Sequence, residues 1–202
     1  MIFFVTDACA LARLYVPDVG SRNMLAIYSY AQSLMIAPNI VYPETISAFL
    51  ESQRAGLIDQ QQYVMLRARL RLDIESQKII SARVRRQQLD LAADLLERHK
   101  LQPRKSLGGA DSIYLSLAVD LARRVKPEGD RVILVTSDGA LYNSALDEPD
   151  IEVFQFWTCD FGCTCNKPFI PVKGVMNSCP TCGKTCAVCR YDVCPSTYVP
   201  EF

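Results

Sequence analysis

The sequence predicts an α/β fold in which helices cover both faces of a parallel sheet, and two observations carry this prediction. Short apolar runs at residues 2–6 and 131–135 have the composition of parallel strands that are buried on both faces. The long stretches between them carry apolar residues at helical spacing, as at Leu66, Leu70 and Ile74. Because strands alternate with helical segments, we expect a three-layer α/β/α sandwich.

The remaining elements follow in chain order. Residues 33–37 and 151–156 are weaker strand candidates of the same kind. Helical segments are expected after Pro43, around Leu91 and Leu95, and from residue 113 to residue 121. The sequence shows no internal repeat.

Composition sets the class of the protein. The chain has 202 residues, of which 50% are apolar, enough for one ordinary domain and an appendage. Its 22 basic and 22 acidic residues balance, so any affinity for nucleic acid must come from a local patch. No basic segment precedes Asp7, and no run approaches the ~18 apolar residues of a membrane span. We therefore expect a cytoplasmic protein without a membrane segment.

Cysteine usage divides the chain in two. Eight of the nine cysteines fall between residues 159 and 194. Because cytosolic thiols are kept reduced, such a cluster predicts metal binding rather than disulfides. We expect a first domain at residues 1–156 and a small metal-stabilised module at residues 157–202.

Acidic residues stand where a parallel sheet of this class binds its ligands, beyond the carboxyl ends of the strands. Asp7 directly follows the first apolar run, and Asp138 follows the run that ends in Val135-Thr136-Ser137. Glu44 and Asp111 each lie in or beside the first turn of an expected helix.

Each acid taken alone suits the positive end of a helix dipole, which is a structural role. The α/β layout, however, brings all four to one edge of the sheet. Like charges packed together raise one another's pKa and destabilise the fold unless a cation neutralises them. The four carboxylates therefore predict a site for Mg²⁺ or Mn²⁺, which prefer oxygen ligands.

Four segments of the first domain, at residues 5–15, 42–48, 109–118 and 135–141, form a pattern in their order and spacing. With this pattern, about residues 2–156 resemble the PIN-domain ribonucleases, and among them the toxins of VapBC toxin–antitoxin pairs. The resemblance implies that Asp7, Glu44, Asp111 and Asp138 form the acidic quartet that holds one or two divalent ions. It also implies that Thr136 supports this quartet, that the substrate is RNA, and that the partners are an antitoxin and a second copy of the chain.

Two positions depart from the family pattern: Cys9 stands where many members carry Ser, and Tyr114 where His is frequent.

The chemistry of a site built from the acidic quartet is metal-assisted hydrolysis of a phosphodiester bond. The single histidine, His99, ends a polar helical segment, where a role at the helix C-terminus is favoured over catalysis. We expect Cys9 to be a buried small residue.

A basic excess lies in the middle of the first domain. Residues 67–105 contain eleven basic side chains against five acidic ones: Arg67, Arg69, Arg71, Lys78, Arg83, Arg85, Arg86, Arg98, Lys100, Arg104 and Lys105. They either flank a groove for RNA phosphates or form a solvated helix face.

The C-terminal module resembles a zinc ribbon. The element Cys179-Pro180-Thr181-Cys182-Gly183 has the spacing of a zinc knuckle. The ligand candidates for one or two structural zinc ions are Cys159, Cys163, Cys165, Cys179, Cys182, Cys186, Cys189 and Cys194, and the sequence leaves their pairing open. The spacings lack a bacterial ferredoxin pattern, which disfavours an iron–sulfur cluster.

Three functions stay open. The first is a Mg²⁺- or Mn²⁺-dependent endoribonuclease of the toxin type. The second is a PIN nuclease with a zinc ribbon that matures ribosomal RNA, which the cysteine module favours. The third is a non-catalytic PIN scaffold whose zinc module binds RNA or protein, and the complete acidic quartet argues against it.

Overall fold

The computed structural model describes residues 1–18, 20–31, 33–99 and 106–156, and these residues form an α/β fold around a five-stranded parallel sheet. The strand order is β3-β2-β1-β4-β5. The strands are β1 (Ile2–Thr6), β2 (Ser33–Pro38), β3 (Ile79–Ala82), β4 (Arg131–Thr136) and β5 (Glu152–Gln155). The predicted cysteine module at residues 157–202 lies outside the described residues.

Seven α-helices and one 3₁₀ turn connect the strands within the described ranges. They are α1 (Ala8–Ala12), α2 (Ser21–Tyr28), α3 (Val41–Arg54), α4 (Gln60–Glu75), α5 (Arg86–His99), α6 (Gly109–Val125), the turn η1 (Lys126–Glu128) and α7 (Gly139–Leu146). Among these helices, none combines the length and the apolar character that crossing a membrane requires.

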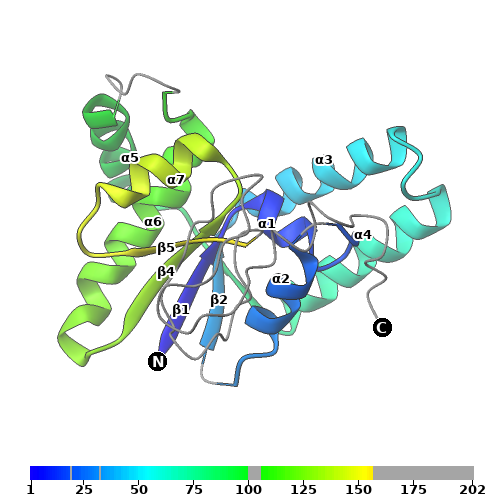
Figure 1. Ribbon diagram of the computed structural model, residues 1–202, viewed down its shortest axis with the longest axis horizontal. Coiled ribbons are helices and arrows are strands. Elements are labelled where there is room, and N and C mark those ends of the chain that lie inside the picture. The colour runs from blue at the N-terminus through cyan, green and yellow to red at the C-terminus, as the bar shows by residue number, and fades with distance from the viewer. Residues whose placement is uncertain (19, 32, 100–105, 157–202) are drawn as a thin grey trace, which may run out of the picture.

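The helices form two layers, one on each side of the sheet (Figure 1). The chain crosses the sheet from β1 through β2 to β3, and then returns from β3 to β4 and on to β5. Connections between parallel strands are right-handed. The two connections from β1 to β3 therefore place α1–α4 on one face of the sheet, and the two connections from β3 to β5 place α5–α7 on the other face. The predicted three-layer sandwich is confirmed.

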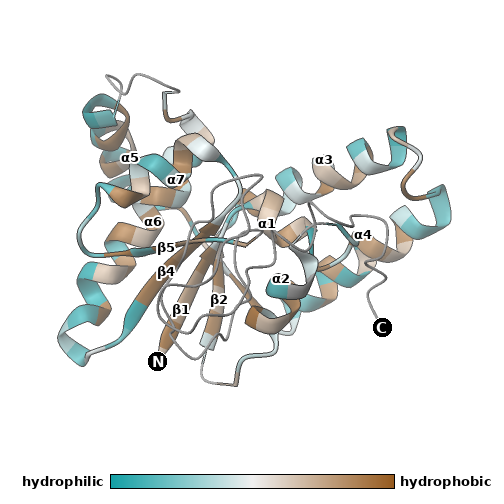
Figure 2. Cartoon of the chain, in the orientation of Figure 1, coloured by the Kyte–Doolittle hydropathy of each residue, from teal (hydrophilic) through white to brown (hydrophobic). Residues whose placement is uncertain are grey.

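The centre of the core lies between β1 and β4. Phe4 and Val5 of β1 and Leu134 and Val135 of β4 are fully buried. These strands are apolar at successive positions rather than alternating, because helices cover both faces of the sheet. Figure 2 shows the resulting brown central strands and the teal outer surfaces of the helices.

The strands predicted at residues 2–6, 33–37, 131–135 and 151–156 correspond to β1, β2, β4 and β5. The sequence did not indicate β3, which pairs with β2 through Met35 and Ile79 and, at its other end, through Pro38 and Ala82. It has four residues, and only its first, Ile79, is fully buried. A strand this short at a sheet edge leaves little apolar signal in the sequence.

Phe156 closes the described body against α2. Its ring is buried beside Gly20, where a Cβ atom would come within 2.3 Å of the ring. Gly20 has a φ of +87°, a conformation that also favours glycine. The Asn23 side chain donates a hydrogen bond to the Phe156 carbonyl. The last described residue therefore belongs to the core of the described body.

Candidate active site

The candidate site lies where the strand order reverses. The chain leaves β1 for β2 on one side and enters β4 on the other, so β1 and β4 are neighbours whose following loops diverge. This is the point at which open parallel sheets bind ligands. Asp7 comes directly after β1, and its backbone N–H donates to the carbonyl of Val135 in β4 at 3.3 Å.

Asp7 is a buried carboxylate at this reversal point, with only 4% of the residue exposed. It caps the short helix α1, because its Oδ1 accepts a hydrogen bond from the Ala10 N–H at 2.6 Å. Its Oδ2 accepts a second hydrogen bond, from the Thr136 hydroxyl. Thr136 is itself fully buried.

The pKa of Asp7 rises from 3.8 to about 7. Burial is the main cause, because a charged carboxylate loses its hydration there. The hydrogen bonds from Thr136 and Ala10 oppose this rise, whereas the nearby charges of Asp111 and Asp138 add to it. The structure therefore brings these three carboxylates close enough to repel one another.

Asp138 is the N-cap of α7. Its Oδ1 accepts hydrogen bonds from the N–H groups of Ala140 at 2.7 Å and Leu141 at 2.9 Å. Its own backbone N–H donates to the Thr136 hydroxyl at 2.9 Å. Thr136 thus connects Asp7 to Asp138, as the resemblance to PIN nucleases led us to expect of a supporting hydroxyl.

Glu44 comes from the other helical layer and is held by Tyr114. It lies in the first turn of α3, as predicted, and its Oε2 accepts a hydrogen bond from the Tyr114 hydroxyl. Tyr114 is 2% exposed, and burial together with the charges of Glu44 and Asp7 raises the pKa of its phenol. In the sequence, Tyr114 was notable only as a departure from the family pattern. Its contact with Glu44 could not be predicted, because the two residues are 70 positions apart.

Asp111 lies in the first turn of α6, as predicted, one turn before Tyr114. Its carboxylate packs close to Gly108, where a Cβ atom would lie 2.7 Å from Oδ2. A side chain at position 108 would therefore push Asp111 out of place. Gly108 therefore leaves room for the Asp111 carboxylate. The sequence alone did not show this role, because a glycine at this position could equally mark the end of a loop or helix.

Asp7 lies within electrostatic reach of Asp111 and Asp138 and accepts a hydrogen bond from the Thr136 hydroxyl, whereas Glu44 is connected to this group through Tyr114. Carboxylate and hydroxyl oxygens are the ligands that a hard divalent cation prefers. In the described residues, no hydrogen bond reaches Asp138 Oδ2 or Glu44 Oε1, so both can still accept a ligand. Across the same residues, however, no three carboxylate, imidazole or thiol groups are arranged to hold a metal ion. Coordination would need side-chain rotation, which the half-buried Glu44, Asp111 and Asp138 can provide.

Cys9 corrects one expectation. Its side chain is exposed rather than buried, because it projects from α1 between the buried Ala8 and Ala10. Neighbouring groups nevertheless remove part of the hydration of the thiol, and this partial desolvation, together with the charge of Asp7, raises the pKa of Cys9 to about 11. The thiol is therefore protonated at neutral pH and is a poor nucleophile.

His99 lies at the C-terminus of α5, as predicted, and connects this helix to the end of α7. It is buried, with Nε2 3.1 Å from Glu148 Oε1. Arg98 donates to the same carboxylate oxygen at 2.7 Å. Through these contacts, Arg98 and His99 at the end of α5 are joined to Glu148, which follows α7.

The fold is shared with solved structures. A structure of FitAB bound to an IR36 DNA fragment has a TM-score of 0.54 at 16% identity, covering 81% of this chain and 100% of that chain. VapC20 of Mycobacterium tuberculosis, described as a toxin that cleaves the sarcin-ricin loop, has a TM-score of 0.48 at 19% identity, and the match covers 75% of this chain and 99% of that chain. FitAcB from Neisseria gonorrhoeae has a TM-score of 0.49 at 16% identity, and the match covers 78% of this chain and 99% of that chain.

The sequence itself matches no protein-family model and no curated protein. At these identities the similarity to FitAB concerns the fold alone. The described residues therefore share the fold of that structure, an α/β/α sandwich around a parallel sheet, which is the predicted fold class.

Proposed function

We propose that this chain is a divalent-metal-dependent endoribonuclease of the PIN toxin type. The observation that carries the proposal is the buried Asp7, whose pKa is raised by burial and by two further carboxylates at the switch point of the sheet. Like charges in such a cluster destabilise a fold unless a proton or a cation neutralises them. The PIN-like fold and the four motif segments favour RNA hydrolysis as that function.

Asp7, Glu44, Asp111 and Asp138 are the proposed ligands of one or two Mg²⁺ or Mn²⁺ ions. A cation held there would neutralise charge on the scissile phosphate and lower the pKa of an attacking water. The chain's own contribution is to fix the carboxylates. Thr136 holds Asp7 and Asp138 through one hydroxyl, and Tyr114 ties Glu44 to the helix that carries Asp111.

An antitoxin is the proposed protein partner and a second copy of the chain the proposed oligomeric partner, both on the strength of the motif resemblance. The alternative processing nuclease would use the same carboxylates on ribosomal RNA. The non-catalytic scaffold would not need them. A gene for a small antitoxin next to the gene for this chain would favour the toxin type over the processing enzyme.

The test is RNA cleavage by the full chain, dialysed against chelator and then supplied with Mn²⁺ or Mg²⁺. Wild-type protein is expected to cleave only with added metal, and Asp7→Asn is expected to lose at least ~100-fold in rate, because a ligand charge is removed at nearly constant volume. Asp94→Asn, an exposed acid on α5, is the matched control and should cleave like the wild type. Cleavage by Asp7→Asn at the wild-type rate would refute the assignment, and inactive wild-type protein would favour the scaffold.

A further inference from the structure

We propose that a second site, outside the carboxylate cluster, binds phosphate groups of an RNA strand. The site is a pocket of about 560 Å³ between the segment that follows β3 and the second half of α6. This inference rests on the proposed function, since it takes RNA as the ligand, and it assigns a place where the strand is held rather than cut.

Positive charge dominates the lining of this pocket. Arg83 and Arg85 contribute from the segment between β3 and α5, Arg86 from the first position of α5, and Arg124 from α6. Asp120 is the acidic residue of the lining, and its carboxylate is already engaged by Arg124 at 2.7 Å. The pocket therefore has an excess of three positive charges.

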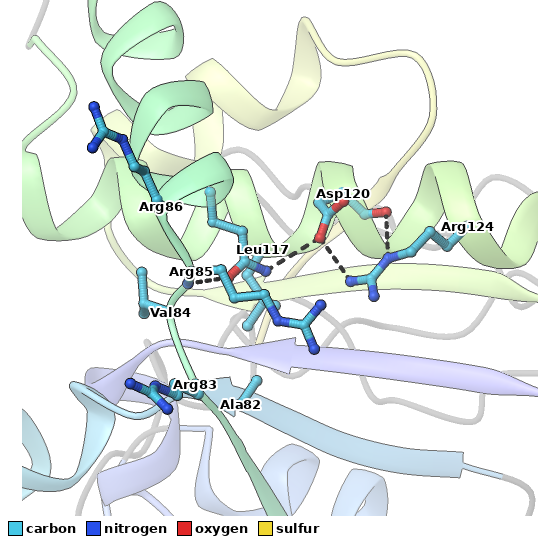
Figure 3. Close-up of a pocket in the computed structure, with 9 residues that line it drawn as sticks. Ala82, Arg83, Val84, Arg85, Arg86, Leu117, Asp120 and Arg124 are labelled. Carbon is cyan, nitrogen blue, oxygen red and sulfur yellow. Dashed lines mark hydrogen bonds and ion pairs between the residues drawn. The ribbon is translucent and has the colours of Figure 1, made fainter.

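Three of these guanidinium groups are uncompensated. Among the described residues, Arg83, Arg85 and Arg86 form no side-chain hydrogen bond or ion pair, and all three are exposed. By contrast, the exposed Arg71 on α4 is paired with Glu75 at 2.6 Å. In Figure 3 the three side chains extend in different directions, so each guanidinium can contact a separate phosphate of a strand.

The pocket wall is fixed by a buried amide. The Gln88 side chain is buried, accepts a hydrogen bond from the Arg85 N–H at 3.0 Å and donates one to Asp120 at 3.2 Å. It therefore fastens the segment after β3 to α6. Figure 3 shows the outcome, in which the Arg85 side chain extends below Asp120 toward that of Arg124.

The chemistry of the lining favours phosphate over a peptide. Guanidinium groups bind phosphate oxygens through paired N–H donors, and a nucleic-acid strand needs no apolar anchor to bind in this way. A peptide partner usually inserts apolar or aromatic side chains into a pocket. The apolar lining here consists of Ala82, Val84 and Leu117 alone, which offers little such surface.

The pocket is separate from the proposed cleavage site. Asp120 comes nine residues after Asp111 on α6, which places it about 13 Å further along the helix and half a turn around it. The two sites therefore face different sides of α6. An RNA held in both must pass around this helix, so the pocket would select folded or bent RNA over a short linear strand.

The experiment compares RNA binding by full-length Arg85→Ala and Arg123→Ala in chelator, where no cleavage occurs. Arg123 is exposed on α6 next to Arg124 but does not line the pocket, so it controls for net charge. The probes are a fluorescent RNA stem-loop and a short single-stranded RNA. Arg85→Ala is expected to weaken stem-loop binding ~10-fold and to reduce the slope of log K against log salt by about 1, while Arg123→Ala leaves both unchanged.

Failure of this inference is distinct from failure of the proposed function. Equal RNA affinity of Arg85→Ala and wild type would overturn the pocket even if the wild type cleaves RNA with Mn²⁺. If the wild type fails to cleave RNA with Mn²⁺ but Arg85→Ala still weakens RNA binding, the nuclease proposal is wrong and the pocket proposal stands. A polyglutamate peptide that binds wild type more tightly than either RNA, and loses affinity in Arg85→Ala, would assign the pocket to an acidic protein instead.

Discussion

Asp7 shows how one buried carboxylate links stability to function. Two hydrogen bonds favour its charged form, yet its pKa still rises to about 7, because burial and two neighbouring carboxylates outweigh them. The folded protein therefore holds a proton that the unfolded chain releases near pH 4. A bound cation would displace this proton and take over its role.

The first prediction concerns stability in metal-free protein. Because the folded-state pKa of Asp7 is raised, its stabilising contribution is full below about pH 4 and is lost as the pH rises through 7. Asp7→Asn should remove this loss. At about pH 8 we expect the unfolding free energy of Asp7→Asn to exceed that of the wild type by ~3 kcal/mol. The pKa difference of Asp7 accounts for a gain of roughly 4 kcal/mol, and the lost hydrogen bond from Thr136 subtracts about 1 kcal/mol.

Urea titrations of wild type and Asp7→Asn in chelator, at about pH 5 and pH 8, measure this gain. The variant should be clearly more stable only at the higher pH. Adding Mn²⁺ at the higher pH should stabilise the wild type and leave the variant nearly unchanged, since metal binding requires the deprotonated carboxylate. The same difference between the two proteins at both pH values would contradict the raised pKa.

Tyr114 is the second residue with a testable role, because it orients Glu44 rather than binding substrate. Tyr114→Phe keeps the buried ring and removes the hydroxyl that donates to Glu44. We expect a loss of about 1 kcal/mol in stability and a several-fold rise in the Mn²⁺ concentration needed for half-maximal cleavage.

Tyr142→Phe is the control for this variant, since Tyr142 is also buried but makes no hydrogen bond to a carboxylate in the described ranges. A metal titration of cleavage distinguishes the two variants. If Tyr114→Phe lowers the maximal rate and leaves the metal dependence unchanged, Tyr114 does not act through Glu44.

At the scale of elements, buried charge joins helices that are distant in sequence. Glu148, just beyond α7, is 4% exposed and receives contacts from Arg98 and His99 at the end of α5. Removing one partner of a buried ion pair leaves the others uncompensated. These contacts tie the end of α5 to the residues that follow α7.

The third prediction is that Glu148→Ala lowers the unfolding free energy by about 3 kcal/mol. Asp147→Ala is the matched control, because the Asp147 side chain is 63% exposed and lies 3.6 Å from His99. It should change stability by less than ~1 kcal/mol. Chemical denaturation of both variants measures the difference, and comparable losses would show that burial of Glu148 is not what matters.

The elements also show what sequence can predict. Strands β1 and β4 were predictable because successive apolar residues mark burial on both faces. The convergence of Asp7 and Asp138 followed from the topology of a parallel sheet. The hydrogen bond of Tyr114 to Glu44 was not predictable, because it depends on how α3 and α6 pack, and Cys9 was misjudged because one turn of α1 decides which side faces solvent.

At the scale of the whole molecule, the boundary after residue 156 is the central question. Phe156 is buried and its carbonyl accepts a hydrogen bond from Asn23, so the core of the described body extends to this residue. We predict that residues 1–156 fold alone and unfold cooperatively within a few degrees of the full chain. Phe156→Ala in the same fragment should cost about 3–4 kcal/mol.

Thermal unfolding of the fragment, its Phe156→Ala variant and the full chain tests this boundary. An insoluble fragment would show that residues beyond 156 complete the first domain. A fragment that tolerates Phe156→Ala without loss would show instead that the core ends before this residue.

The last prediction separates the two parts of the molecule by their metals. The eight cysteines between residues 159 and 194 would provide thiolates, which hold zinc tightly enough to survive purification. The proposed carboxylate ligands, such as Asp7 and Asp138, would hold Mg²⁺ or Mn²⁺ only weakly, so dialysis should remove these ions. Elemental analysis of the dialysed full chain should therefore give about one to two zinc ions per chain and almost no magnesium or manganese.

The fragment of residues 1–156 is the control for this measurement and should contain no zinc. Cys179→Ser in the full chain should lower the zinc content by about one ion, because it breaks the Cys179-x₂-Cys182 pair. Nuclease activity should depend on added Mn²⁺ or Mg²⁺ in the chain and in the fragment alike, since the proposed ligands all precede residue 156. Stoichiometric iron with visible absorbance, or zinc retained by the fragment, would contradict this division of metals between the two parts.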